Sequence, residues 1–257
     1  MKPVSGKGQE TAVVFGLHAV RTLLQQHAER VSLLSVQQGR DDARIAEVLE
    51  LAKQRNVRIE RREARELDRL AGHERHQGVC AQVQGSGVLG EGALDELLDQ
   101  TNGASGPPLL LVLDGVQDPH NLGACLRTAD AVGVTAVIVP RDRAAGLSPT
   151  VRKVASGAAE TVPLIQVVNL ARTLRWLKER NIWIVGTDDQ APQSLHQASL
   201  TGPLAVVLGA EGPGLRRLTK EHCDTLVGIP MRGVVESLNV SVATGVVLYE
   251  VLRQRGG

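Results

Sequence analysis

The chain has 257 residues, of which 42% are hydrophobic, so it can bury the core of one large domain or of two smaller ones. Its formal net charge is only +1, which excludes a protein that covers nucleic acid by bulk charge alone. Aromatic residues make up 2% of the chain, too few to build platforms that stack single-stranded bases.

The first residues and the cysteines predict a cellular compartment. The opening stretch, MKPVSGKGQET, lacks the apolar segment of a signal peptide, and no apolar run reaches the roughly 18 residues of a membrane span. Cys80, Cys125 and Cys223 are scattered without a C-x-x-C pair, which fits a reducing compartment. We therefore expect a cytoplasmic protein with free thiols, no metal and no membrane contact.

Residues 1–84 are predicted to form a first α/β unit, because short β-like runs alternate with amphipathic helical patterns. The β-like runs are VSLLSV, NVRIE and GVCAQV, and the helical stretches are LHAVRTLLQQH and DARIAEVLELAKQR. Residues 85–108 then contain glycine, proline and four acidic residues without a basic one, around one short helix-like piece, ALDELLDQ. We expect this second segment to be a flexible linker.

Residues 109–257 are predicted to form a second α/β unit. Its β-like runs are LLLVLDG, TAVIVP, TVPLIQV, IWIVGT, LAVVLG and TLVGIP, and helical patterns such as LARTLRWLKERN separate them. Nearly continuous apolar strands that alternate with helices indicate a mostly parallel sheet covered on both faces. Ligands of such sheets bind beyond the carboxyl ends of the strands.

The first unusual strand end of this unit is VLDGVQDPHNLGACLR. A strand ends at Asp114, and Asn121 is the natural N-cap of the helix that follows. Arg127 lies further along the same helix. Taken alone, such an arginine is more often a solvated side chain paired with a neighbour, here Asp130.

The second strand end, LAVVLGAEGPGLRR, leads from a buried strand into Gly209 and a glycine-rich turn that contains Glu211. Glycines let the backbone approach a ligand closely or take positive φ, but their spacing here matches neither the dinucleotide fingerprint nor the P-loop. Taken alone, Glu211 would be an exposed loop carboxylate.

The third is VVESLNVSVATG, which places Ser237, Asn239 and Ser241 inside the last apolar run. A helix cap followed by an amphipathic helix, with Ser241 as a small packing residue, is one interpretation of this pattern. A binding site is the other, because an amide such as that of Asn239 needs several partners and a site provides them more readily than a core does.

Together, the three strand ends have a specific order: N-x-G-x-x-x-R, then G-x-E-G-x-G-L, then I-P-M-x-G-x-x-E-S-L-N-V-S-V-A. This order, within residues 109–252, resembles the motifs of the SpoU branch of the SPOUT RNA ribose methyltransferases. The runs VVFGLHAVRTLL and HERHQGVCAQV further resemble the members that methylate guanosine 2′-hydroxyls in bacterial 23S rRNA, whose extra N-terminal domain is similar to an L30e-type RNA-binding fold.

The resemblance implies a fold and a cofactor. In this family the second domain is a SPOUT domain, a parallel sheet whose C-terminal segment passes through a loop to make a deep trefoil knot. S-adenosylmethionine binds in that knot. Carried onto this chain, the residues expected to contact the cofactor are Gly209, Glu211, Ile229, Met231 and Leu238.

The resemblance also implies a reaction, the in-line attack of a ribose 2′-hydroxyl on the sulfonium methyl. The residues expected to serve it are Asn121, Arg127, Glu211, Ser237 and Asn239, with Glu211 fixing either Arg127 or the loop geometry. The family's proposed proton acceptor is the arginine. Because a guanidinium stays protonated in almost any protein setting, we expect Arg127 to stabilise the developing alkoxide or to hold a phosphate instead.

Members of this family are homodimers in which the arginine can approach the cofactor of the partner subunit, so a homodimer is expected here. The RNA contacts expected in the first unit are Arg21, Arg58, Arg61 and Arg62, although RIERREARE is also typical of a solvated segment with local ion pairs. Two alternatives stay open: a transfer RNA ribose methyltransferase, and a non-catalytic RNA-binding factor in ribosome assembly. An open Rossmann methyltransferase is disfavoured, because no glycine-rich turn follows LLLVLDG.

Overall fold

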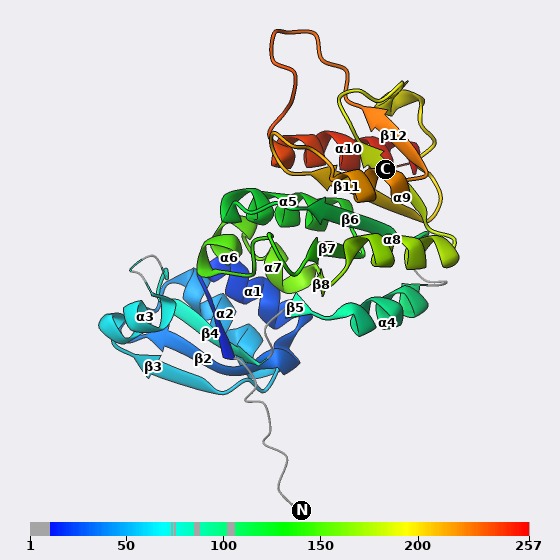
Figure 1. The fold of residues 1–257 in the computed structure, drawn as a ribbon. Coiled ribbons are helices and arrows are strands. Elements are labelled where there is room, and N and C mark those ends of the chain that lie inside the picture. Colours follow the sequence, from blue (N-terminus) through cyan, green and yellow to red (C-terminus); the bar gives the residue numbers. More distant parts are fainter. Residues whose placement is uncertain (1–10, 73, 75, 85–87, 102–105, 257) are drawn as a thin grey trace, which may run out of the picture. The chain divides into compact units, whose positions relative to one another are not determined.

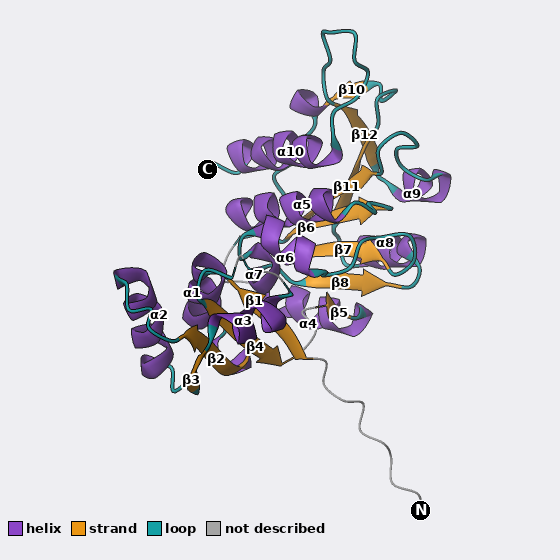
Figure 2. Ribbon diagram, turned by 90° about the vertical axis from the view of Figure 1, so that its left-hand side faces the viewer, coloured by secondary structure: helices purple, strands orange, loops and turns teal. Residues whose placement is uncertain are grey.

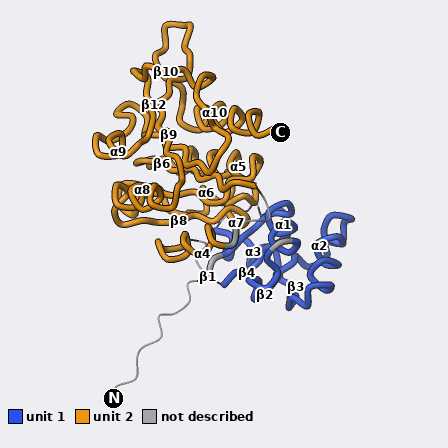
Figure 3. The backbone as a smooth tube through the Cα atoms, turned by 90° about the vertical axis from the view of Figure 1, so that its right-hand side faces the viewer, with its two compact units in different colours: residues 1–87 blue, residues 88–257 orange. Residues whose placement is uncertain are grey.

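The computed structural model describes residues 11–72, 74, 76–84, 88–101 and 106–256. The chain divides into two compact units, residues 1–87 and residues 88–257 (Figure 3). Each unit has its own sheet and its own hydrophobic core, so each folds around a separate interior.

The first unit is a four-stranded sheet with helices packed against it. Strand β4 pairs antiparallel with both β1 and β2, and β3 lies parallel to β2, which gives the order β1-β4-β2-β3. The elements are β1 (Thr11–Phe15), α1 (Leu17–Gln26), the 3₁₀ helix η1 (Ala28–Arg30), β2 (Val31–Gln37), α2 (Ala43–Gln54), β3 (Ile59–Arg62), α3 (Ala64–Ala71) and β4 (Val79–Gln84). The expected small α/β unit is confirmed.

Local signals set the helix ends of this unit. Asp42 begins α2, because its Oδ1 accepts hydrogen bonds from the main-chain N–H groups of Arg44 (3.1 Å) and Ile45 (3.2 Å). The side-chain Oε1 of Gln77, in the turn before β4, accepts from the main-chain N–H of Leu17 at 3.0 Å. This hydrogen bond therefore connects the HQGV segment, in the turn before β4, to the start of α1.

The second unit is an eight-stranded sheet in which every paired strand is parallel, in the order β10-β12-β9-β11-β6-β7-β8-β5 (Figure 1). The strands are β5 (Val88–Leu89), β6 (Leu109–Asp114), β7 (Ala136–Pro140), β8 (Leu164–Val167), β9 (Trp183–Thr187), β10 (Gln193–Ser194), β11 (Leu204–Gly209) and β12 (Thr225–Gly228). The helices are α4 (Glu91–Thr101), α5 (Pro119–Val132), α6 (Pro149–Ala155), α7 (Ala158–Thr161), α8 (Leu170–Glu179), the 3₁₀ helix η2 (Leu195–Gln197), α9 (Arg217–His222) and α10 (Val240–Gln254). The predicted parallel sheet is confirmed.

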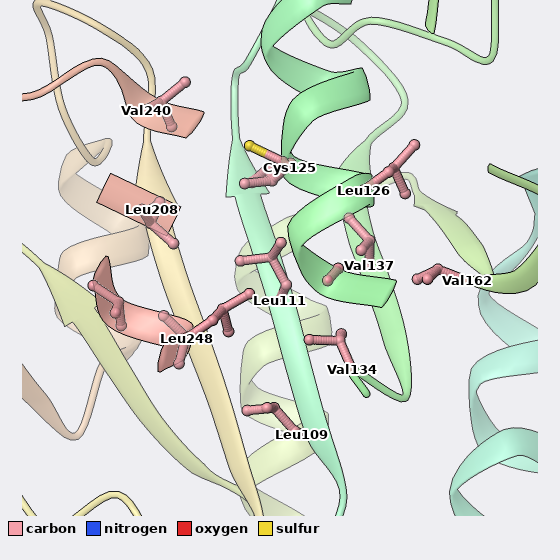
Figure 4. Close-up of a cluster of buried hydrophobic side chains, with 14 of the residues drawn as sticks. Leu109, Leu111, Cys125, Leu126, Val134, Val137, Val162, Leu208, Val240 and Leu248 are labelled. Atoms are coloured by element: carbon pink, nitrogen blue, oxygen red, sulfur yellow. The ribbon is translucent and has the colours of Figure 1, made fainter. Parts of the chain in front are cut away.

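Helices cover both faces of this sheet, as the continuous apolar strands predicted (Figure 2). Alternate residues of β6 point to opposite faces. Leu109 and Leu111 belong to a cluster with α5, α6, α7 and α10, whereas Leu110 and Val112 belong to a cluster with α4 and α8. Figure 4 shows Leu111 between Cys125 of α5 and Leu248 of α10. The last helix is therefore built into the core.

The segment expected to be a flexible linker, 85–108, instead contributes two elements to the second unit. Strand β5 pairs with β8, and α4 is tied to α8 and to the loop before it. Glu91 accepts from the main-chain N–H of Val168 (2.8 Å) and pairs with Arg172 (2.7 Å). Arg180 forms ion pairs with Asp95 and Asp99. Three of the four acidic residues that suggested a solvated linker are thus partners of arginines on α8 and at its C-terminal end.

The three cysteines are free, as expected. Burial raises the pKa of the Cys80 and Cys223 thiols to about 12 and that of Cys125 to about 11, so all three are protonated at neutral pH. Over the described ranges, no helix is both long and apolar enough to cross a membrane. The trefoil knot is compatible with this strand order and stays a prediction.

Candidate active site

Three loops meet at the carboxyl edge of the large sheet and border a cavity of about 190 Å³. They follow β9, β11 and β12, and the first turn of α10 completes the wall. The lining residues are 187–189, 208–215, 220, 229, 231, 236–238, 240 and 243. The cavity lies where a parallel sheet is expected to bind its ligand.

The glycine-rich turn after β11 depends on its glycines. A Cβ on Gly209 would lie 2.1 Å from the main-chain carbon of Gly214, a distance that no folded chain tolerates. Gly212 and Gly214 have φ angles of 85° and 64°, in the left-handed region that glycine adopts most readily. The main-chain N–H of Gly214 donates to the carbonyl of Ala210 at 3.0 Å. The turn therefore closes on itself and borders the cavity with main chain.

The side chains of Asn121, Glu211 and Asn239 come together, although the two asparagines lie 118 positions apart. Asn121 Nδ2 donates to Glu211 Oε1 at 3.1 Å. Asn239 Nδ2 donates to Asn121 Oδ1 at 3.0 Å and also to Glu211 Oε1. The main-chain N–H of Val240 approaches the same carboxylate oxygen at 3.4 Å. One carboxylate thus joins the three motifs that the sequence placed at separate strand ends.

Asn239 is also the N-cap of α10. Its Oδ1 accepts from the main-chain N–H of Ser241 at 2.9 Å and from the Ser241 hydroxyl at 2.6 Å. The amide therefore caps the helix with its oxygen while its nitrogen reaches Asn121 and Glu211. Of the two interpretations of this segment, the helix cap is confirmed, and the binding site stays a prediction.

The expectation that Asn121 caps its helix is wrong. Helix α5 begins at Pro119, and Asp118 is the N-cap, with its Oδ1 accepting from the main-chain N–H of His120 at 2.9 Å. Proline at the first helical position fixes φ where a helix needs it and lacks only an N–H that would have no helical partner. Asn121 is therefore inside the first turn, and its side chain is free to reach Glu211.

Arg127 does not join this cluster. It lies on the exposed side of α5 and lines no part of the cavity. Glu211 contacts the two asparagines, not Arg127, so of the two expected roles of Glu211 only the control of loop geometry matches its contacts. The alternative pairing with Asp130 does not form either, since Asp130 accepts from the hydroxyl of Thr161. Across the described residues, Arg127 has no hydrogen-bond or ion-pair partner.

The other predicted residues line the cavity. Gly209, Ile229, Met231 and Leu238 border it, and so does Ser237 on the loop before α10. That loop projects from the unit as a long excursion (Figure 1), and Val234 within it is fully exposed. The structure therefore brings together every predicted site residue except Arg127.

Sequence reasoning missed the contribution of β9. Thr187, Asp188 and Asp189 follow this strand and line the cavity, and Lys220 of α9 forms an ion pair with Asp188. Burial acts to raise the pKa of Asp188, but the hydrogen bond and charge of Lys220, with the main-chain N–H of Gln190, hold it below its ordinary value. The sequence did contain a signal for this contribution, because two aspartates directly follow the buried strand in IWIVGTDD.

Comparisons with known proteins agree with this geometry. Residues 108–249 match the model of the SpoU rRNA Methylase family, and residues 13–87 match the model for RNA 2′-O ribose methyltransferase substrate binding. A relative from Pseudomonas syringae pv. tomato, 23S rRNA (guanosine-2′-O-)-methyltransferase RlmB, is 57% identical over 94% of this chain and 95% of its own.

Two solved structures have the same fold. That of an RNA 2′-O ribose methyltransferase covers 96% of this chain and 90% of its own, with a TM-score of 0.72 and 29% identity. The structure of the SpoU methyltransferase AviRb from Streptomyces viridochromogenes in complex with AdoMet matches 95% of this chain and 90% of the AviRb chain. Its TM-score is 0.78 and its sequence identity is 24%. The resemblance carried by the three strand-end motifs is thereby confirmed: the chain belongs to the SpoU rRNA methylase family.

Proposed function

We propose that this protein transfers a methyl group from S-adenosylmethionine to the ribose 2′-hydroxyl of a guanosine in 23S rRNA. The observation that carries the proposal is the Asn121–Glu211–Asn239 cluster at the edge of a cavity, in a chain 57% identical to a 23S rRNA (guanosine-2′-O-)-methyltransferase. The acceptor is ribosomal RNA, which supports the expected cytoplasmic location.

The cavity fits the cofactor in chemistry. When bound, S-adenosylmethionine supplies an electrophilic methyl group on a sulfonium. Leu208, Ile229, Met231 and Leu238 provide apolar surface for a flat ring, and the turn at Gly209 presents main-chain groups that can pair with a base edge. Carboxylates after β9 can accept from ribose hydroxyls. Predicted cofactor contacts at Gly209, Glu211, Ile229, Met231 and Leu238 all lie on this wall.

The chain must align a ribose oxygen with the methyl carbon and manage the proton that leaves the hydroxyl. Bound S-adenosylmethionine would supply the methyl carbon and its sulfur would keep the electron pair, while the hydroxyl proton would pass to water or to an oxygen of a neighbouring phosphate. Glu211 holds Asn121 and Asn239 in fixed positions, which supports their role in positioning the acceptor ribose. Ser237 lines the same wall and adds one hydroxyl. Arg127 stabilises the developing alkoxide or binds the adjoining phosphate.

Because Arg127 lies away from the cavity of its own chain, we place it in the site of a partner subunit, as part of a homodimer. Exposed apolar side chains on α10 support such an interface. Val242 and Tyr249 are 52% and 54% exposed and seven positions apart, so they share one helix face. Val235, on the loop before α10, is 70% exposed. A second copy of the chain would bury this surface.

The first unit supplies affinity for RNA. Each of the four predicted contacts already has a carboxylate partner: Arg21 pairs with Glu47, Arg58 and Arg62 with Glu60, and Arg61 with Asp41. Phosphates must therefore compete with these ion pairs, which are weak at an exposed surface. The Arg58 side chain is 74% exposed and is the most accessible of the four.

The test is transfer of labelled methyl from S-adenosylmethionine to unmodified 23S rRNA, with transfer RNA and the Arg127→Ala protein alongside. We expect label only in 23S rRNA, resistant to alkali at one guanosine and lost in the variant. Label in transfer RNA would show that transfer RNA, and not 23S rRNA, is the methyl acceptor. Cofactor binding without transfer to any RNA, free or in ribosomal particles, would contradict the enzyme assignment.

A further inference from the structure

A second cavity, of about 280 Å³, lies against the first one. It is lined by residues 115–118, 121, 210, 211, 213 and 240. Ala210, Glu211, Pro213 and Val240 line both cavities, so these residues form a shared wall. A methyl donor and its acceptor must meet across a short gap, and two cavities with one common wall provide that arrangement.

The outer side of this cavity is formed by the loop between β6 and α5. Its polar side chains are those of Gln117, Asp118 and Asn121. Asp118 uses one oxygen, Oδ1, to accept from the main-chain N–H of His120 at the start of α5. Among the described residues, its Oδ2 has no hydrogen-bond or ion-pair partner, and the side chain is exposed. The loop therefore offers a carboxylate oxygen with free acceptor capacity.

We propose that the second cavity receives the acceptor nucleoside and that Asp118 selects guanine there. This inference rests on the proposed function and adds the residue that chooses the base. Guanine presents two neighbouring donors, N1–H and the 2-amino group, and a carboxylate accepts from both. Adenine presents an unprotonated N1 at the same position, and cytosine an unprotonated N3, so the carboxylate repels both bases. Gln117 lines the same cavity, and its amide can donate to O6 of guanine.

A third cavity also adjoins the first, so it is the competing acceptor site. It is lined by residues 189–191, 193, 194, 228–231 and 236 and measures about 510 Å³. None of Asn121, Glu211 or Asn239 lines it. Because Asn121 and Glu211 both line the second cavity, it is the one of the two candidates that has side chains of the polar cluster at its edge.

The experiment replaces Asp118 by asparagine. Asparagine is as good a helix N-cap as aspartate, so α5 keeps its start and the fold is preserved. Its amide can donate to N1 of adenine and accept from the 6-amino group. The variant should therefore lose the preference for guanine and gain one for adenine. Methyl transfer is measured on a 23S rRNA fragment whose target nucleotide, mapped first with the wild-type protein, is guanosine, inosine or adenosine.

With the wild-type protein we expect kcat/KM to fall from guanosine to inosine, which lacks the 2-amino group, and again to adenosine. With Asp118→Asn we expect transfer to guanosine to fall by about 10- to 100-fold and the guanosine-to-adenosine ratio to approach or pass unity. The dissociation constant of S-adenosylmethionine, measured by calorimetry, should stay within about twofold. Gln190→Ala, which changes only the third cavity, is the matched control and should keep wild-type kinetics.

Three results would overturn the inference. The first is an Asp118→Asn protein that keeps wild-type transfer and the full preference for guanosine. The second is Asp118→Asn losing transfer equally for all three nucleotides, which would indicate a structural role. The third is Gln190→Ala showing the loss instead, which would move the acceptor to the third cavity. In each case wild-type transfer to guanosine leaves the proposed function standing, whereas no wild-type transfer to any RNA removes both.

Discussion

Arg216 makes three hydrogen-bonding contacts with the buried carboxylate of Asp114. Its Nε donates to Oδ1 at 2.6 Å, its Nη2 lies 2.5 Å from the same oxygen, and its main-chain N–H donates to Oδ2 at 3.1 Å. The Asp114 side chain is fully buried, at the carboxyl end of β6, and Arg216 follows the glycine-rich turn after β11. This contact holds the glycine-rich turn after β11 against the carboxyl end of β6.

We predict that Asp114→Ala destabilises the protein by about 2–3 kcal/mol, because it removes a buried acceptor and leaves the guanidinium and an amide without their partner. The freed turn should also weaken S-adenosylmethionine binding. Urea denaturation and calorimetry measure the two effects. Arg217→Ala is the control, since its pair with Glu221 is exposed at 80% and 48%, and it should change stability by less than about 0.5 kcal/mol.

Gly209→Ala should abolish cofactor binding. The added methyl group would meet the main chain at Gly214, and main chain can yield only if the turn opens. Gly92→Ala provides a contrast, because nothing lies within 4 Å of a Cβ there and the position is inside α4. We expect that substitution to stabilise the protein by up to about 1 kcal/mol. Cofactor binding by Gly209→Ala at wild-type affinity would show that the turn does not border the cofactor.

Two substitutions separate the roles of Asn239. Asn239→Ser keeps an N-cap for α10 but cannot reach Asn121 and Glu211, so stability should change by less than about 0.5 kcal/mol while methyl transfer falls by about tenfold or more. Asn239→Ala loses the cap as well and should cost about 1 kcal/mol more. Thermal unfolding and transfer kinetics are measured on both. If activity tracked stability across the pair, Asn239 would be a capping residue alone.

Arg127 gives a test of shared active sites. Arg127→Ala and Asn239→Ala proteins should each be inactive alone. In a dimer formed from one chain of each, one site has an intact Asn239 and receives the intact Arg127 of the other chain. Random mixing should therefore restore about a quarter of wild-type activity. Mixtures as inactive as the separate proteins would place Arg127 in the site of its own chain. Arg127→Lys should retain measurable transfer if electrostatic stabilisation is its task.

The lowered pKa of Glu250 predicts that the stability of the protein depends on pH. Hydrogen bonds from Arg253 and Gln254 and the nearby charges lower its pKa from the ordinary 4.5 to about 2. A carboxyl whose folded pKa is depressed stabilises the fold above its unfolded pKa and loses that contribution as pH falls toward the folded value. Glu250→Gln should therefore be less stable than wild type at pH 7, and the difference should shrink between about pH 4.5 and 2. A constant difference in urea denaturation would contradict this.

The sequence predicted the larger features of the fold because periodicity is a local signal. Six apolar runs of the second unit became β6, β7, β8, β9, β11 and β12, and the motif order identified the family. The two-residue strands β5 and β10 were missed, since two residues carry no periodicity and their pairing depends on neighbours distant in sequence. The linker was misjudged because the arginine partners of its acids lie on and just after α8.

The strand-end motifs predicted residues that line the first cavity, but their spacing could not predict which side chains contact one another. Asn121 was assigned to the wrong position because Asp118 and Pro119 offer a better helix start. The contact of Glu211 with both asparagines could not be read from spacing, since it requires three loops to meet. The position of Arg127 outside its own cavity is likewise a property of how α5 packs.

The docking of α4 also removes residues 88–101 from any flexible linker. A flexible linker over all of 85–108 could extend to roughly 80 Å, whereas residues 88–101 are held in β5 and α4. Strand β5 lies at the edge of the sheet, four strand spacings from β11, or roughly 20 Å. Folding of this segment therefore removes the conformational freedom that a flexible linker over the same residues would have kept.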